Sequence, residues 1–223
     1  VCQGPSWHTR GVPQTGKRGP GRPPAAQAAD TRERILRAAC EVFTELGYDA
    51  ATFQAVASRS DLTRPAINHY FSSKKVLYNA VLDQMNARLL AAAATRAHAG
   101  HTLVDRLTMF IEAAIEADEE NQSAAGFLST AVLEGQRHPG LTPPEKDPLE
   151  LLRQILKWAV AESVASGELP VGADTEGLID LLLSMVWGMG FYAGFVGGHE
   201  ELRHMTVQIR LLFEKRLLEA PSE

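Results

Sequence analysis

Residues 52–74 read TFQAVASRSDLTRPAINHYFSSK, and this stretch decides the fold of the chain. It contains two short runs whose apolar residues recur at helical spacing. Thr52 precedes the first run and Thr63 the second, and threonine is a good N-cap because its hydroxyl accepts a hydrogen bond from a free backbone N–H. We therefore expect helices at about 53–58 and 64–70. Two short helices joined by a tight turn are typical of a helix-turn-helix motif.

The second helix of such a motif enters the major groove of DNA and reads base edges with its N-terminal residues. In this chain Ile67 and Phe71 are four residues apart, so we expect both to hold the helix against the core. Arg64, Asn68 and His69 then fall on the exposed side. Arginine can read guanine and asparagine can read adenine, and each contact contributes about 1–3 kcal/mol of discrimination.

Other polar residues near the motif suit the DNA backbone. The ring of Tyr70 can pack on the core while its hydroxyl reaches a phosphate. Lys74 stands at the start of the next expected helix, where free backbone N–H groups and a cation together favour an anion. We expect DNA contacts from the following residues: Thr52, Thr63, Arg64, Asn68, His69, Tyr70, Lys74 and, in the N-terminal arm, Arg22.

Helical patterns continue on both sides of this motif. Asp30 is the expected N-cap of a first helix, and Gly47 ends it. A fourth helix runs from Lys74 to about Ala94. Glycine and proline separate the remaining helices, which we expect at 102–118, 123–136, 148–166, 175–196 and 200–218.

The chain is therefore predicted to be all-α, with nine helices in two domains. Residues 30–75 form an N-terminal three-helix helix-turn-helix DNA-binding domain. Residues 76–223 form a larger C-terminal helical domain for ligand binding and dimerisation. Residues 1–29 hold five Gly and five Pro and few apolar side chains, which predicts a disordered basic arm.

The run from Arg34 to Leu82 resembles the DNA-binding region of the tetracycline-repressor (TetR) family. The matching elements are AxxxFxxxGY at 39–48, TxxxVA at 52–57 and the block INHYFSSK at 67–74. The resemblance implies a dimeric regulator, usually a repressor, whose last two helices pack against those of a second subunit.

The sequence departs from the family pattern at two positions. Asp61 replaces the usual glycine of the turn, and aspartate tolerates left-handed backbone better than most residues. Asn68 stands where the middle of the recognition helix usually carries an aromatic residue.

Charge is distributed unevenly along the chain. Residues 1–75 contain 11 Lys and Arg against 6 Asp and Glu, whereas the rest contains 11 against 21, which gives net charges of +5 and −10. A basic head on an acidic body predicts double-stranded DNA as the partner of the head alone.

The arm sequence KRGPGRPP at 17–24 resembles an AT-hook that inserts into the minor groove. The alternative is a solvated linker that adds only nonspecific attraction.

The segment at 178–196 is apolar around nearly its whole circumference, so a single chain can cover only part of it. The last helix supplies a facing stripe of Ile209, Leu212, Phe213 and Leu217. We expect a homodimer, the alternative being an intramolecular core helix. A membrane span is not expected, because the uncharged run at 181–196 is shorter than the roughly 20 residues that a bilayer requires.

Pockets in helical domains lie between helices and are mostly apolar. We expect the effector to be an apolar small molecule, lipid-like or aromatic. The alternative for each bulky candidate is a place in the ordinary core. The candidates are Met109, Phe110, Phe127, Trp158, Trp187, Met189 and Phe191.

Other classes of protein lack support in the sequence. There is no glycine-rich phosphate loop, no HExxH or CxxC spacing and no nucleophile in a recognisable turn, so we expect no enzyme, metal site or cofactor. The acidic stretch at 114–120 is interpreted as a solvated helix end. Two cysteines, Cys2 and Cys40, form no disulfide framework, which favours the cytoplasm. A helical adaptor that binds only protein would leave the basic head unexplained.

Overall fold

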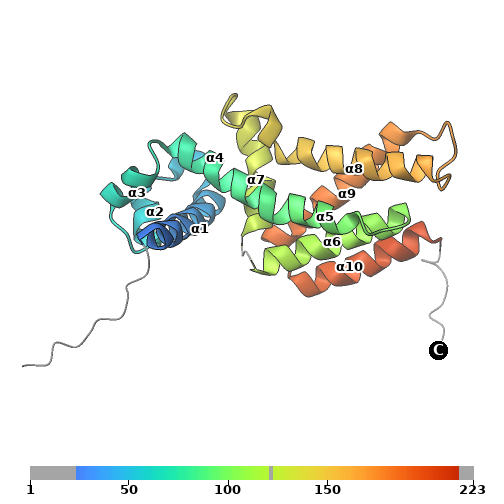
Figure 1. Cartoon of the computed structure of the whole chain (residues 1–223), viewed down its shortest axis with the longest axis horizontal. Helices are drawn as coiled ribbons and strands as arrows, with labels where there is room; N and C mark the ends of the chain where they lie inside the picture. Colours follow the sequence, from blue (N-terminus) through green and yellow to red (C-terminus); the bar gives the residue numbers. More distant parts are fainter. Residues whose placement is uncertain (1–23, 121–122, 216–223) are drawn as a thin grey trace, which may run out of the picture.

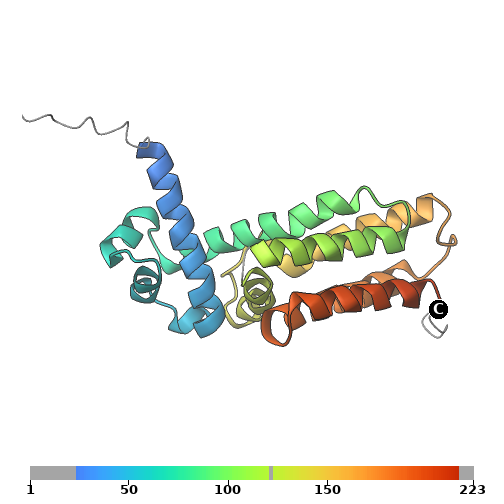
Figure 2. The ribbon, with the colours of Figure 1, turned by 90° about the horizontal axis from the view of Figure 1, so that it is seen from below.

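The structure is a computed structural model that describes residues 24–120 and 123–215. All regular secondary structure in these residues is helical, as predicted. Figure 1 shows a small head at the N-terminal side of the described chain and a longer body, joined by a long helical rod. Seen from below, the head lies at one end of the body and the helices of the body run mostly along its length (Figure 2).

The head contains α1 (Pro24–Ala50), α2 (Phe53–Arg59) and α3 (Arg64–Tyr70). The helix α1 begins at Pro24, six residues before the predicted cap Asp30, so the predicted arm extends too far. A proline fits the first turn of a helix, and the alanine-rich run behind it has high helix propensity, which explains the earlier start. Residues 1–23 lie outside the described residues. The helical path breaks at Gly47, as predicted, where φ is 75°.

The predicted caps and turn of the motif are confirmed. The hydroxyl of Thr52 accepts a hydrogen bond from the backbone N–H of Ala55 at 3.1 Å, and that of Thr63 accepts one from Ala66 at 3.3 Å. Asp61 has a φ of 52°, so it adopts the left-handed backbone that the turn requires. The sequence therefore fixes the relative orientation of α2 and α3 through local hydrogen bonds and one special backbone conformation.

The predicted fourth helix is a rod of three consecutive segments: α4 (Lys74–Met85), the π-helix η1 (Asn86–Ala91) and α5 (Ala92–Ala97). The rod starts in the head and ends in the body (Figure 1). The body contains α6 (Leu103–Glu120), α7 (Ala124–Arg137), the 3-10 turn η2 (Pro144–Lys146), α8 (Pro148–Ala165), α9 (Thr175–Phe195) and α10 (His199–Phe213). These spans agree with the five predicted helices to within a few residues, and positions 216–218 of the last one lie outside the described residues.

Head and body share one hydrophobic core. Phe43 of α1, Tyr78 of α4 and Phe127 of α7 are each at most 2% exposed. The Tyr78 ring lies edge-on to Phe43, with centroids 5.1 Å apart, and 5.4 Å from Phe127. Such aromatic pairs contribute about 0.5–1.5 kcal/mol beyond the area that they bury. The head is consequently packed onto the body and is not tethered by a free linker.

The helices α7 and α9 approach closely at two glycines. A Cβ added at Gly194 would lie 2.5 Å from the Cα of Gly126, closer than real Cβ atoms come to backbone. A Cβ added at Gly126 would lie 3.2 Å from Cγ2 of Thr44 on α1. The helix α7 is thus held between the first helix of the head and the apolar helix α9.

Gly194→Ala is expected to destabilise the protein by about 2 kcal/mol or more, because the added methyl group forces α7 and α9 apart. Gly135→Ala on α7 is the matched control, since a Cβ there meets no atom within 4 Å. Thermal unfolding of both variants measures the effect. Equal melting temperatures for the two variants would contradict the close contact.

Candidate DNA interface and ligand cavity

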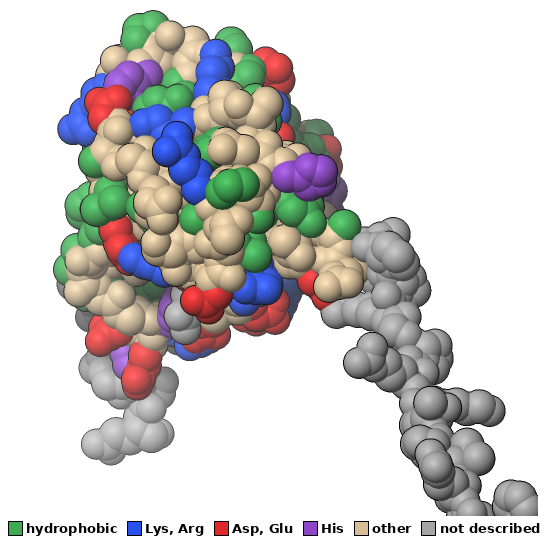
Figure 3. Space-filling view, turned by 90° about the vertical axis from the view of Figure 1, so that its left-hand side faces the viewer, with side chains coloured by type: hydrophobic (Ala, Val, Ile, Leu, Met, Phe, Trp, Pro, Cys, Tyr) green, Lys and Arg blue, Asp and Glu red, His purple; other side chains and the backbone are tan. Residues whose placement is uncertain are grey.

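The exposed side of α3 carries the predicted base-reading residues. Ile67 is fully buried and Phe71 is 2% exposed, so the helix is held to the core as predicted. Arg64, Asn68 and His69 are exposed. Arg64 and Asn68 are four residues apart, so they lie on one face of the helix, one turn from each other. Figure 3 shows the head end of the molecule, where Lys, Arg and His side chains are spread among uncharged ones, with Asp and Glu side chains also in view.

Two of the predicted contacts also have a structural role. The hydroxyl oxygens of Thr52 and Thr63 accept the capping hydrogen bonds, while their O–H groups keep a proton to donate. Both residues are exposed at helix N-termini, where backbone N–H groups favour anions. Contacts from these residues to DNA phosphates stay a prediction.

Tyr70 and Lys74 are half-buried beside the recognition helix. The ring of Tyr70 packs edge-on against His69, with centroids 5.5 Å apart. The ammonium of Lys74 donates to the carbonyl oxygens of Tyr48 at 2.7 Å and Asp49 at 3.0 Å, and it lies 4.5 Å from the centre of the Tyr48 ring. Lys74 therefore fastens the end of α1 to the start of α4, and it keeps a third N–H, whose contact with a DNA phosphate stays a prediction.

Other basic residues of the head hold its helices together. Arg59 of α2 forms ion pairs with Glu41 at 2.9 Å and Glu45 at 2.7 Å, both on α1. Hydrogen bonding to Arg59 lowers the pKa of the Glu45 carboxyl. Arg34 donates to the carbonyl oxygen of Ser60 at 2.6 Å. Lys75, which the sequence analysis did not select, is exposed in the first turn of α4. Arg22 lies outside the described residues.

The body contains an apolar cavity between η1 and the helices α6 to α10. The volume open to the centre of a water-sized sphere is about 70 Å³, smaller than the roughly 300–1,000 Å³ of typical small-molecule sites, so a bulky ligand would have to displace lining side chains. Among the predicted ligand residues, Phe110, Trp187 and Met189 line it. Most of the other lining side chains are aliphatic: Leu89, Leu90, Ile111, Ala114, Ile115, Ala125, Leu128, Leu152, Val186, Ala193 and Leu202.

Four predicted ligand residues do not line this cavity. Phe127 belongs to the core between head and body, and Met109 lies on another side of α6. Trp158 stacks on His98, with ring centroids 3.9 Å apart, and faces a separate open groove. Phe191 is 51% exposed on the outer side of α9. Apolarity marked these residues as buried or partner-facing, but only the packing of the helices decides which of their faces encloses a cavity.

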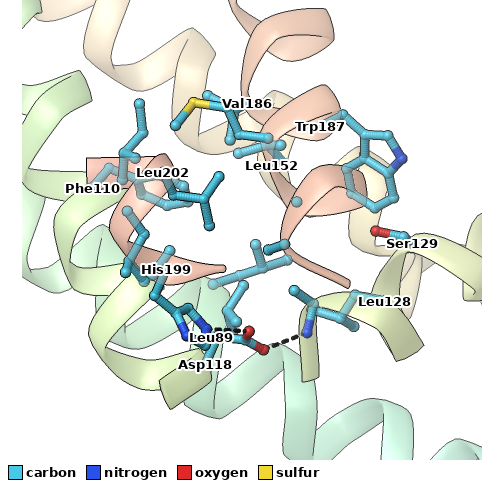
Figure 4. Close-up of a pocket in the computed structure, with 18 residues that line it drawn as sticks. Leu89, Phe110, Asp118, Leu128, Ser129, Leu152, Val186, Trp187, His199 and Leu202 are labelled. Carbon is cyan, nitrogen blue, oxygen red and sulfur yellow. Dashed lines mark hydrogen bonds and ion pairs between the residues drawn. The ribbon is translucent and has the colours of Figure 1, made fainter. Parts of the chain in front are cut away.

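The cavity has a polar end that the sequence analysis missed. Asp118, within the stretch interpreted as a solvated helix end, is only 6% exposed. Its Oδ1 accepts a hydrogen bond from the backbone N–H of Ala125 at 2.8 Å, and its Oδ2 lies 2.9 Å from Nε2 of His199. Both side chains line the cavity (Figure 4). A signal was present: Asp118 is three residues after Ile115 and four after Ala114, so it shares the inner face of α6.

Cys40 is a buried thiol on α1. Burial raises its pKa to about 12, so the thiol stays protonated and is a poor nucleophile. Its Sγ lies 3.7 Å from the carbonyl oxygen of Ser123, just before α7.

The described residues contain no group of three or more His, Cys, Asp or Glu that could hold a metal ion.

Comparisons with known proteins agree with this architecture. Residues 35–81 match the sequence model of a family described as "Bacterial regulatory proteins, tetR family". The HTH-type transcriptional repressor BepR of Brucella suis biovar 1 is 31% identical over 173 residues, which cover 73% of this chain and 80% of BepR. The chain belongs to the TetR family. It is thus a helix-turn-helix transcriptional regulator and not an enzyme.

Two further proteins place this TetR-family regulator among its relatives. The HTH-type transcriptional regulator UidR of Escherichia coli K12 is 25% identical over 163 residues, 73% of this chain and 81% of UidR. The structure of FadR from Bacillus subtilis in complex with stearoyl-CoA shares the fold, with a TM-score of 0.64 and 17% identity over 82% of this chain and 98% of FadR.

For this TetR-family regulator, Arg64→Ala and Asn68→Ala are each expected to weaken specific DNA binding by about 1–3 kcal/mol and to relax preference at one operator position, because each removes a base contact. Lys157→Ala, on the body helix α8, is the control. Quantitative footprinting on single-base operator variants measures both effects. Unchanged base preference in Asn68→Ala would exclude Asn68 from base reading.

Lys74→Met is expected to act on stability and on DNA binding together. Loss of the two carbonyl contacts lowers the free energy of unfolding by about 1–2 kcal/mol. Loss of a phosphate contact weakens binding to all DNA sequences. It also reduces the slope of the logarithm of the binding constant against the logarithm of the salt concentration by about one. Lys75→Met is the control for stability. A Lys74 variant with normal stability but altered sequence preference would contradict both roles.

Proposed function

We propose that this TetR-family regulator is a repressor that binds a palindromic operator as a homodimer and is released by an apolar small molecule. Such a protein acts on chromosomal DNA in the cytoplasm. Repression is supported by the name of BepR, a transcriptional repressor that aligns with most of the chain. The dimer, the operator symmetry and the effector are supported by separate features of the body.

The outer face of α9 and α10 supports the homodimer. By length and composition, α9 is the one helix among the described residues apolar enough to cross a membrane, yet only 22% of its apolar window is buried within the single chain. The exposed large apolar side chains on these two helices are Leu181, Phe191, Phe195, Val207 and Leu212. A patch of this kind marks a protein interface. Two copies packed by α9 and α10 would place two recognition helices about a two-fold axis, which requires a palindromic site.

The observation that carries the proposal is the path of the rod. Its first residue, Lys74, contacts the end of α1 beside the recognition helix, and Leu89 and Leu90 in its η1 segment line the cavity. A ligand can release DNA only if it favours a conformation in which the recognition helices are misplaced. A tilt of this rod on ligand binding would move both heads and lose both half-sites together.

The lining of the cavity supports an apolar effector. Sixteen of the 18 lining residues carry no titratable group, and most are aliphatic or aromatic. The similarly folded FadR of Bacillus subtilis holds stearoyl-CoA, so this architecture is compatible with a ligand that has a long apolar part. The same lining offers little to a sugar or a small ion.

Phe191→Glu combined with Leu212→Glu is expected to convert a dimer into a monomer, because two charges would be buried in the interface. The variant loses operator affinity by at least about 100-fold, since only one half-site is held at a time. Val171→Glu, in an exposed loop, is the control. Sedimentation and footprinting on DNA upstream of its own gene measure assembly and symmetry. A monomeric native protein, or a footprint without two-fold symmetry, would refute the proposal.

A further inference from the structure

We propose that the Asp118–His199 pair is a polar subsite that selects an amphipathic ligand with a protonated amine at one end of an apolar body. The inference rests on the proposed function, because it assigns the chemistry of the effector site. It narrows the effector from any apolar compound to one charge class. The pair lies at one end of the cavity, away from Trp187 and Ser129 (Figure 4).

The charges around the cavity are few and unbalanced. Among the described residues that line it, Asp118 and His199 are the titratable ones, and neither Lys nor Arg lines it. Arg203 of α10 forms an ion pair at 2.6 Å with Glu119, which is not a lining residue. A ligand inside the cavity therefore meets a single carboxylate and an imidazole, surrounded by hydrocarbon.

Asp118 retains capacity for a ligand. Its carboxylate accepts one hydrogen bond on each oxygen, from Ala125 and from His199. A carboxylate has about four lone-pair sites, so further sites are left for an N–H donor. A buried charge in apolar surroundings is costly unless it is paired and hydrogen-bonded. An entering ammonium group would add a second charged partner beside His199 and donate a charge-assisted hydrogen bond.

An acidic ligand would find the opposite environment. Its carboxylate would have to approach Asp118, and like charges repel strongly where water is excluded. His199 does not provide a free partner for the carboxylate of such a ligand. Its Nε2 lies 2.9 Å from Oδ2 of Asp118, and its Nδ1 lies 3.9 Å from Oε1 of Glu119. Both ring nitrogens thus already face carboxylates. The site consequently discriminates against fatty acids of the same chain length.

The Asp118–His199 subsite is also connected to the head through the start of α7. Asp118 bonds the first turn of α7, whose own cap residue Ser123 forms no side-chain capping bond and has a φ of 81°. The carbonyl oxygen of Ser123 contacts Cys40 on α1. A ligand that draws Asp118 toward the cavity therefore acts on the corner that joins α6, α7 and the first helix of the head.

Three probes with one ten-carbon chain test the proposal: decylamine, decanol and decanoate. Isothermal titration calorimetry at neutral pH, on the full chain without DNA, measures their affinities, the amine being charged and the acid ionised. We expect decylamine to bind at least about tenfold tighter than decanol, and decanoate to bind weakest. Equal or tighter binding of decanoate, or no binding of any probe, overturns the proposal.

Variants locate the preference. Asp118→Asn keeps the shape of the side chain but removes its charge, so the amine loses its advantage over decanol while decanol affinity is unchanged. Glu119→Gln is the matched control, because Glu119 is adjacent but outside the lining, and it keeps the preference for the amine. His199→Leu removes the partner of Oδ2, so the carboxylate depends more on an entering ammonium group and the preference for decylamine over decanol increases. This second variant provides an independent test if the loss of the charge prevents Asp118→Asn from folding.

Release of operator DNA separates this inference from the proposed function. We expect decylamine to release DNA from the native dimer at about tenfold lower concentration than decanol. Release by decanol with no preference for the amine leaves the repressor function intact and overturns the subsite. Preferred binding of the amine without any release of DNA supports the subsite and contradicts the proposed switch.

Discussion

The contact of Tyr78 with Phe43 and Phe127 is the interaction on which the rest of the structure depends. It brings the first head helix, the rod and α7 into one core. Close-packed interiors have few voids and do not deform continuously. A displacement of α7 is therefore passed to α1 and to the rod at the same place, and a change in the body reaches the DNA-binding surface without a flexible linker.

The contact between Gly126 and Gly194 adds the helix α9 to this packed arrangement. Gly126 of α7 lies against both Gly194 of α9 and the Thr44 side chain of α1, so three helices meet at one closely packed point. Backbone packed against backbone leaves little freedom for sliding, because no rotamer can adjust to fill a gap. The helix that the proposed dimer would cover is thus mechanically linked to the head through a single intervening helix.

Local features of the fold were predictable from the sequence, whereas features created by packing were not. Capping by Thr52 and Thr63 and the left-handed Asp61 depend on residues a few positions away, so pattern alone identifies them. The predicted start of α1 at Asp30 was wrong, because a helix can begin before a good cap residue when alanines continue the helical pattern. Phe127 and Phe191 have similar sequence contexts, yet one is in the core and the other exposed, and that difference is set by which helices surround them.

The two sides of α9 connect the ligand site with the proposed interface. Trp187, Met189 and Gly190 line the cavity, whereas Phe191 and Phe195 are exposed on the other side, with ring centroids 5.1 Å apart. One helix thus forms both the wall of the cavity and the surface offered to a second copy. A ligand that widens the cavity must move α9, α6 or the rod, and α9 is fixed to α7 at Gly194. In the proposed dimer the movement would then be shared between the dimer axis and the head, which together would set the spacing of the recognition helices.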